Sequence, residues 1–226
     1  MKKAFVATLP VLAGYLVLGS AYGVLMSASG FSPWYTALMS LFVYAGSLQF
    51  AAIGLLTGGA SLLSAGLTAF SVNARHVFYG LSMAERYRGA GRIKPYLIFA
   101  LTDETYALVS RAHPGLSPAE ELRLCLRVSL LDHIYWVSGS LLGALAGSLL
   151  SLNVQGLDFA LTALFLTVFI DQWRDGEKQH AAALTGAGLT LACLLLFGKD
   201  SFLIPALGLI LAALLLFPKE TGEEKQ

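Results

Sequence analysis

The first charged residue after Lys2 and Lys3 is Arg75, so residues 4–74 contain no Asp, Glu, Lys or Arg. A helix that crosses a bilayer needs about 20 predominantly apolar residues, and this stretch has room for about three such helices. Only 13% of the whole chain is charged, about half of what a soluble domain carries. These features exclude a soluble enzyme, a nucleic-acid-binding protein and a disordered chain. They predict an all-α, polytopic integral membrane protein that works in the lipid bilayer.

The apolar runs predict about 7–8 transmembrane helices, some of them broken or re-entrant. They form one transmembrane domain over residues 1–217, followed by a short polar tail at 218–226. The candidate spans are Thr8–Met26, Trp34–Leu56, Ser61–Met83, Pro95–Arg111, Leu124–Leu150, Asp158–Trp173, Ala181–Phe197 and Ser201–Phe217.

The protein is expected to be a multi-pass protein of the cell membrane, and the positions of Lys and Arg, which favour the cytoplasmic side of a membrane, predict its orientation. With eight spans, most of these residues collect on the side of the N-terminus, which is therefore predicted to be cytoplasmic. The dense cluster from Arg86 to Lys94 falls on the opposite side. It would change sides if a span were miscounted or if two early segments folded back.

Polar side chains are concentrated in the third span, where Asn73 and His76 share one helical face and Arg75 and Tyr79 another. An ionisable side chain near the bilayer centre costs about 2.5–3.5 kcal/mol, so such residues usually face a bundle interior or an aqueous cavity. Arg75 can pair with Asp103 or Asp132 of another span. It can instead hold a substrate carboxylate, or the pair can serve only to fix helix packing.

The second span contains Tyr44, Gly46, Ser47 and Gln49 in the middle of an apolar run. Small residues at this depth suit a broken helix, whose free N–H and C=O groups bind carboxylates and cations. The alternative is close helix packing with Gln49 bonded across helices.

Two adjacent acids, Asp103 and Glu104, occupy the fourth span. Neighbouring residues on a helix point about 100° apart, so both cannot face one partner. One acid can pair with Arg75 while the other faces water or a substrate amine. Alternatively, if the helix begins late, both acids complement its N-terminus.

The fifth span carries Asp132 and His133, then Trp136, then Gly139, Gly143 and Gly147. The three glycines form one smooth stripe that favours close contact with another helix, from this chain, a partner or another copy in an oligomer. Asp132 and His133 can relay protons, since His titrates near neutral pH. A structural role near the start of the helix is the alternative.

Hydrolytic, zinc-protease and nucleotide-binding motifs are missing. The two cysteines are too few for a Cys-rich metal site. We therefore expect no metal, no cofactor, no enzymatic activity and no nucleic-acid partner.

Five segments carry a family resemblance: Phe42–Ala52 (FVYAGSLQFAA), Asn73–Gly80 (NARHVFYG), Leu101–Leu108 (LTDETYAL), Tyr135–Gly147 (YWVSGSLLGALAG) and Gly156–Phe165 (GLDFALTALF). Together they resemble the AzlC/YgaZ family, the large subunits of branched-chain amino acid exporters. The resemblance implies export of L-valine and related amino acids, together with a small multispan partner of the AzlD/YgaH type. The positions Asn73, Arg75, His76, Asp103 and Glu104 match the family pattern.

A branched-chain amino acid is a zwitterion with a small apolar side chain, so it needs a carboxylate partner, an ammonium partner and an apolar pocket. Arg75 with Asn73 and His76 can supply the first, and Asp103 or Glu104 the second. Tyr44, Tyr79 and Trp136 can line the third. Two alternatives stay open. One is an intramembrane enzyme on lipid or peptide that uses Asp103 with Glu104, or Asp132 with His133, and the other is an assembly subunit that transports nothing.

Overall fold

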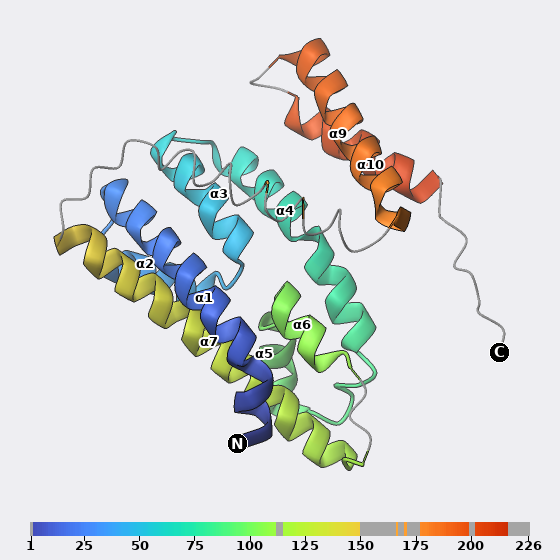
Figure 1. Cartoon of the computed structure of the whole chain (residues 1–226). Helices are drawn as coiled ribbons and strands as arrows, with labels where there is room; N and C mark the ends of the chain where they lie inside the picture. Colours follow the sequence, from blue (N-terminus) through green and yellow to red (C-terminus); the bar gives the residue numbers. More distant parts are fainter. Residues whose placement is uncertain are drawn as a thin grey trace. The chain divides into compact units, whose positions relative to one another are not determined.

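The computed structural model describes residues 2–111, 115–149, 177–198 and 202–216, with positions 166 and 170, and all regular elements in these ranges are helices. The all-α prediction is confirmed for this part of the chain (Figure 1). The chain divides into two compact units, Met1–Gln155 and Gly156–Gln226. The tail at 218–226 and most of the candidate span Asp158–Trp173 lie outside the described residues.

The first unit contains two long helices, which lie side by side in Figure 1. Helix α1 spans Lys2–Ala28 and helix α7 spans Pro118–Leu149. At 1.5 Å per residue, the 27 residues of α1 extend about 40 Å, more than the ~30 Å hydrocarbon core. Within the described residues, only these two helices are both long and apolar enough to cross a membrane alone. The count of about 7–8 spans therefore stays a prediction.

Glycines allow α1 and α7 to approach each other closely. A Cβ added at Gly143 would lie 2.1 Å from the backbone oxygen of Ser20, and one at Gly139 would lie 2.6 Å from that of Tyr15. A Cβ added at Gly147 would lie 2.9 Å from the side-chain Cβ of Ser27. Helix α1 contributes Gly23, whose added Cβ would lie 2.1 Å from the Ser140 oxygen. The stripe of small residues on α7 thus lies against α1 of the same chain.

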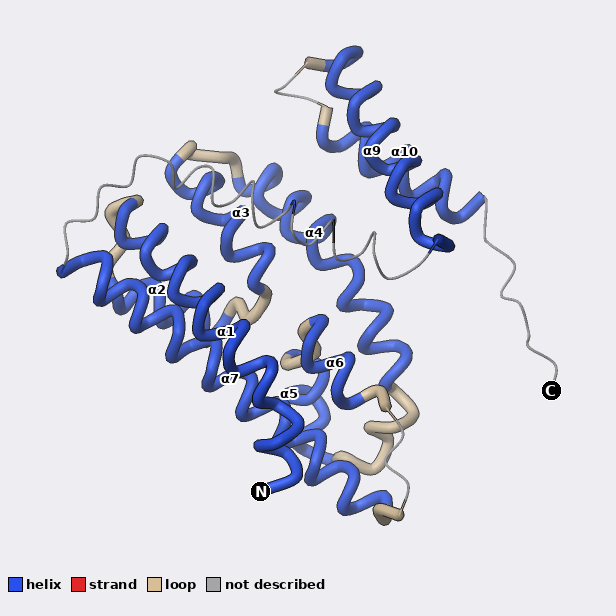
Figure 2. The backbone as a smooth tube through the Cα atoms, viewed as in Figure 1, coloured by secondary structure: helices blue, strands red, loops and turns tan. Residues whose placement is uncertain are grey.

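The predicted second span, Trp34–Leu56, is not one helix but two short ones. Helix α2 (Pro33–Phe42) ends before Val43, and α3 (Gly46–Thr57) begins after Ala45. The backbone turns tightly between them, since the N–H of Ala45 donates to the oxygen of Val43 at 2.7 Å. The loop between the two helices is visible in Figure 2. Each helix is too short to cross a bilayer alone, and the break falls beside Gly46 and Ser47.

The predicted third span is a single helix, α4 (Leu62–Met83), whereas the predicted fourth span, Pro95–Arg111, is broken. The 3-10 turn η1 (Gly91–Ile93) leads into α5 (Lys94–Phe99), and α6 (Asp103–Val109) follows after a break at residues 100–102. The hydroxyl of Thr102 caps α6 by accepting from the N–H of Thr105. The first unit therefore contains two breaks, at 43–45 and at 100–102.

Buried apolar residues at one end of the first unit join α1, α4, α5, α6 and α7. The fully buried Tyr87 and Leu97 belong to this core. Beside it, Arg86 connects the chain after α4 with the end of α6 and the start of α7. Its guanidinium donates to the backbone oxygens of Ser110 and Arg111 and pairs with Glu121. Part of the basic cluster Arg86–Lys94 thus serves to fix the fold at this end.

Large apolar side chains point outward along α4. Leu62 is 93% exposed, and Phe70, Val77, Phe78 and Leu81 are exposed too. Contiguous exposed apolar surface of this kind is rare in soluble monomers. Contact with the hydrocarbon of a bilayer accounts for this surface, while polar side chains of the same unit such as Gln49, Thr105 and Asp132 are buried.

The second unit contains α9 (Glu177–Phe197) and α10 (Leu203–Leu216), which pack against each other. Gly198 ends α9 with a φ of 71°, a left-handed conformation that suits glycine. These helices correspond to the predicted spans Ala181–Phe197 and Ser201–Phe217.

Candidate functional site

An ion pair joins α4 to the start of α6. The Arg75 Nη2 atom lies 3.0 Å from Asp103 Oδ2, and Tyr79 donates to the other oxygen of Asp103 at 2.7 Å. The two charged side chains are 34% and 40% exposed, so the described residues do not fully enclose either of them. Of the two partners that the sequence offered Arg75, the structure brings Asp103 to it.

Arg75 also reaches the first turn of α3. Its Nη2 atom donates to Ser47 Oγ at 3.2 Å. Residue Ala45 at the helix start makes no side-chain capping bond to α3, so the first N–H groups of α3 have no side-chain acceptor there. The buried Arg75 Nε has no hydrogen-bond partner among the described residues. A guanidinium beside an uncapped helix N-terminus is an arrangement that suits a carboxylate.

The two neighbouring acids at the start of α6 point to different partners. Asp103 faces Arg75, while Glu104 Oε2 accepts from the Tyr15 hydroxyl of α1 at 2.7 Å. Because α6 begins at Asp103, both acids lie in its first turn, where negative charge is favoured. The sequence left open whether one acid pairs with Arg75 or both acids complement a helix N-terminus. In the structure both are true.

Asp132 lies in the interior of α7 and not near its start, because α7 already begins at Pro118. The interpretation of Asp132 and His133 as residues near a helix start was therefore wrong. Asp132 is fully buried, and its Oδ2 accepts from Thr105 at 2.9 Å. Its other oxygen, Oδ1, is buried with no hydrogen-bond partner in the described part of the chain.

Aromatic rings surround His133 at the break between α2 and α3. Tyr44 is 4% exposed and stacks on the imidazole with ring centroids 4.3 Å apart. Tyr96 of α5 lies on another side, with its hydroxyl 3.3 Å from His133 Nδ1. Tyr44 therefore connects the break to the middle of α7. Its ring, which was expected to line an apolar pocket, lies against the polar imidazole of His133.

A hydrogen bond between Gln49 and Trp136 links α3 to α7 next to the break between α2 and α3. The indole Nε1 of Trp136 donates to Gln49 Oε1 at 2.5 Å, and Gln49 Nε2 donates to Ser40 Oγ at 3.2 Å. A Cβ added at Gly46 would lie 3.0 Å from the Trp136 ring. Gly46 therefore lets the first turn of α3 approach Trp136.

Asn73 and His76 are less closely connected. His76 lies beside Tyr79, with ring centroids 5.8 Å apart, and this places it next to the Arg75–Asp103 pair. In the described ranges no hydrogen bond links Asn73 to the pair. Of the three residues expected to hold a substrate carboxylate, Arg75 pairs with Asp103, His76 lies next to this pair and Asn73 stands apart.

Sequence reasoning missed Tyr15, Thr102 and Thr105, which connect Glu104 to Asp132 by hydrogen bonds. Tyr15 sits in a mostly apolar stretch of α1, and no neighbouring charged residue marks it. The signal for Thr102 was available, because a Thr directly before two acids is a typical N-cap.

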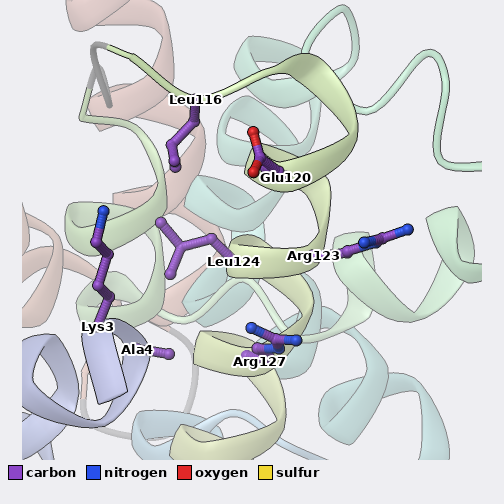
Figure 3. Close-up of a pocket in the computed structure, with 7 residues that line it drawn as sticks. All are labelled: Lys3, Ala4, Leu116, Glu120, Arg123, Leu124 and Arg127. Atoms are coloured by element: carbon purple, nitrogen blue, oxygen red, sulfur yellow. The ribbon is translucent and has the colours of Figure 1, made fainter. Parts of the chain in front are cut away.

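One pocket lies away from these residues, between the start of α1 and residues 116–127. It encloses about 430 Å³, and Figure 3 shows the residues that line it: Lys3, Ala4, Leu116, Glu120, Arg123, Leu124 and Arg127. Glu120 forms a capping box with Ser117 at the start of α7. None of the residues predicted to bind substrate lines this pocket.

Apolar outward faces around charged and aromatic side chains at two helix breaks are typical of integral membrane proteins that move polar solutes. The family description "AzlC protein" matches residues 10–150. The chain therefore belongs to the AzlC family, and this membership supports a transport role in a membrane.

Relatives agree with this assignment. The chain is 44% identical over 206 residues to the "Branched-chain amino acid transport protein AzlC" of Bacillus subtilis, covering 91% of this chain and 80% of that protein. It is 32% identical over 198 residues to the "Inner membrane protein YgaZ" of Escherichia coli, covering 81% and 79%. An "Uncharacterized membrane protein" of Haemophilus influenzae is 42% identical over 209 residues, covering 91% and 84%. No solved structure matches the chain.

Replacing Gln49 with leucine is expected to lower stability by about 1–3 kcal/mol, because the buried Trp136 N–H loses its acceptor. Thermal unfolding in detergent measures the effect. Gln49→Glu keeps an oxygen acceptor and serves as the matched variant for the indole bond. A leucine variant as stable as the parent protein would show that the indole finds another acceptor.

Proposed function

We propose that this protein exports branched-chain amino acids, L-valine among them, as a secondary transporter that works by alternating access. The observation that carries the proposal is the position of Arg75, which lies at the uncapped start of α3 and pairs with Asp103. The name of the Bacillus relative supports the same class of substrate.

The carboxylate of the amino acid binds between Arg75 and the first N–H groups of α3. Its ammonium group binds Asp103, which then exchanges part of its contact with Arg75 for the substrate. A zwitterion brings one charge of each sign, so each partner keeps an opposite charge and no buried charge is left alone. The net charge of the site does not change on binding.

The apolar side chain of the substrate lies against the rings near the breaks. Tyr44 and Trp136 flank the start of α3, and Tyr79 stacks on Tyr106 on the side of Asp103. Rings of this size accept side chains of several shapes, because one methylene in an apolar pocket changes affinity by only about 1–3 kcal/mol. We therefore expect valine, leucine and isoleucine to share the site.

The proposal also includes the membrane, the orientation and the partner of the protein. It is placed in the cell membrane with a cytoplasmic N-terminus, and it works with a small multispan subunit of the AzlD/YgaH type. The exposed apolar face of α4 provides surface for lipid and for such a subunit.

Counterflow tests the proposal directly. Purified protein in vesicles preloaded with unlabelled valine is expected to take up labelled valine faster than protein-free vesicles, with and without the small subunit compared in parallel. Leucine and isoleucine should compete, whereas lysine and glutamate should not, because the site balances one charge of each sign. Absence of counterflow in both preparations, or equal competition by lysine, would contradict the assignment.

Direction is tested in cells. Cells that accumulate valine from a valine-containing dipeptide are expected to release it faster when they produce the protein. Faster uptake without faster release would overturn export as the direction.

A further inference from the structure

A continuous chain of hydrogen bonds connects Glu104 to the buried Asp132. The Tyr15 hydroxyl lies 2.7 Å from Glu104 Oε2 and 2.6 Å from Thr102 Oγ1. Thr102 Oγ1 donates to Thr105 Oγ1 at 3.1 Å, and Thr105 Oγ1 donates to Asp132 Oδ2 at 2.9 Å. Three helices contribute to this path: Tyr15 comes from α1, Thr105 from α6 and Asp132 from α7.

The chain runs from an accessible end to a buried one. Glu104 is exposed, whereas Tyr15 and Thr102 are 3% and 6% exposed and Thr105 and Asp132 are fully buried. No Lys or Arg in the described part of the chain forms an ion pair with Asp132, and one of its oxygens lacks a partner. A buried carboxylate without a cation is costly, and a proton is the simplest cation that can balance it.

We propose that the hydroxyls of Tyr15, Thr102 and Thr105 carry a proton between Glu104 and Asp132, and that this proton couples transport to a proton gradient. The inference rests on the proposed transport function and adds its coupling ion and the path of that ion. Acidic side chains linked through polar groups inside a membrane are typical of proton relays.

The transfer balances at every atom. Protonated Glu104 gives its proton to the Tyr15 oxygen, Tyr15 gives its own to Thr102, Thr102 to Thr105, and Thr105 to Asp132. As many O–H bonds form as break, each hydroxyl ends neutral, Glu104 becomes a carboxylate and Asp132 a carboxylic acid. The donor directions from Thr102 to Thr105 and from Thr105 to Asp132 are those seen in the structure. With Glu104 ionised, the Tyr15 hydroxyl donates to its carboxylate. Once Glu104 is protonated, the Tyr15 hydroxyl turns and donates to Thr102, a bond that can run in either direction.

The buried end of the path lies close to the proposed substrate site. Asp132 and Trp136 are four residues apart on α7 and therefore share a face, and Trp136 donates to Gln49 in the first turn of α3. The titratable groups that interact electrostatically with Asp132 are Tyr44 at the first break, Tyr96 on α5 and Glu104 on α6, and His133 follows Asp132 in the chain. All of these belong to the first unit, so the proton on Asp132 is placed where it can bias the break next to the substrate.

The experiment separates exchange from coupling in reconstituted vesicles. Exchange is counterflow of labelled valine without a pH gradient, and coupling is valine movement driven by an imposed pH gradient. Thr105→Val and Tyr15→Phe each remove one hydroxyl from the path and keep the shape of the side chain. We expect both to keep counterflow within about twofold and to lose pH-driven transport by about 10²-fold, the low end of what a positioned proton-transfer group contributes.

Two variants serve as controls. Thr105→Ser keeps the hydroxyl and is expected to retain both activities. Thr36→Val makes the same substitution as Thr105→Val at another fully buried threonine, whose hydroxyl donates to the nearby Ser32 oxygen. It is also expected to retain both. Wild-type pH-driven transport by Thr105→Val, or loss of its counterflow together with its coupling, would overturn the relay.

An infrared measurement tests the path without any substrate. After a rapid drop in pH, the purified protein should develop carbonyl bands of protonated carboxylic acids, and the component that Asp132→Asn removes belongs to Asp132. Thr105→Val and Tyr15→Phe should slow its appearance, and an unchanged rate would contradict the relay. Failure of wild-type counterflow would instead contradict the proposed transport function, so the two failures are distinguishable.

Discussion

Replacing Arg75 with alanine is expected to abolish export of branched-chain amino acids while the protein still inserts in the membrane. The substitution removes both the partner of the substrate carboxylate and the partner of Asp103. Charge-assisted hydrogen bonds contribute about 1.5–3 kcal/mol, and each 1.4 kcal/mol is about tenfold in affinity. We therefore expect the initial rate of valine efflux to fall by at least about tenfold, measured in cells loaded through a dipeptide.

Two further variants make this result specific. Arg88→Ala removes another arginine, but Arg88 is exposed and its ion-pair partner among the described residues is the equally exposed Glu85, so efflux should be unchanged. Arg75→Lys keeps the charge but loses the planar fork, and it should retain part of the activity. Normal efflux from Arg75→Ala at equal membrane abundance would remove Arg75 from the mechanism.

The largest effect on stability is expected from Gly143→Ala. The added Cβ would lie 2.1 Å from the backbone oxygen of Ser20 and 2.5 Å from its Cα, and backbone atoms cannot move aside as a side chain can. Relief requires α1 and α7 to separate. Overpacking typically costs 1–3 kcal/mol, and for backbone against backbone we expect about 3 kcal/mol or more, seen as a lower midpoint of thermal unfolding in detergent.

Gly14→Ala provides the matched control on the same helix pair, because nothing lies within 4 Å of the position of its added Cβ. It should leave the unfolding midpoint unchanged or raise it slightly, since alanine favours helix more than glycine does. Gly147→Ala should be intermediate, because its neighbour is the Ser27 side chain. Equal stability of Gly143→Ala and Gly14→Ala would show that α1 and α7 are not held at this distance.

The predictions from sequence were most accurate where composition or periodicity determines the outcome. The apolar runs located α1, α4, α9 and α10, because a helix in lipid satisfies its own hydrogen bonds and needs only length and apolarity. The spans Trp34–Leu56 and Pro95–Arg111 were placed as units, although both are broken. Small residues indicated the first break. The second break was visible only as the alternative in which the helix of Asp103 begins late.

The site was partly predictable for a similar reason. Charged and amide side chains in an apolar run must face a protein interior, so Arg75, Asp103 and Gln49 could be selected without coordinates. The partners of these residues could not be identified from the sequence. Tyr15 lies 87 residues from Thr102 in the chain, yet their hydroxyls are 2.6 Å apart, and no local pattern encodes a contact of that separation.

The amino-acid sequence alone therefore determined that this is an all-α membrane protein with polar groups inside it. Hydrophobic burial depends on residue type and spacing, which the sequence states directly. Only the tertiary structure decided that Arg75 pairs with Asp103, that Glu104 connects to Asp132, and that the glycines of α7 lie against α1. Hydrogen bonds and ion pairs depend on distances of about 3 Å, and such distances are set only when helices far apart in the chain pack together.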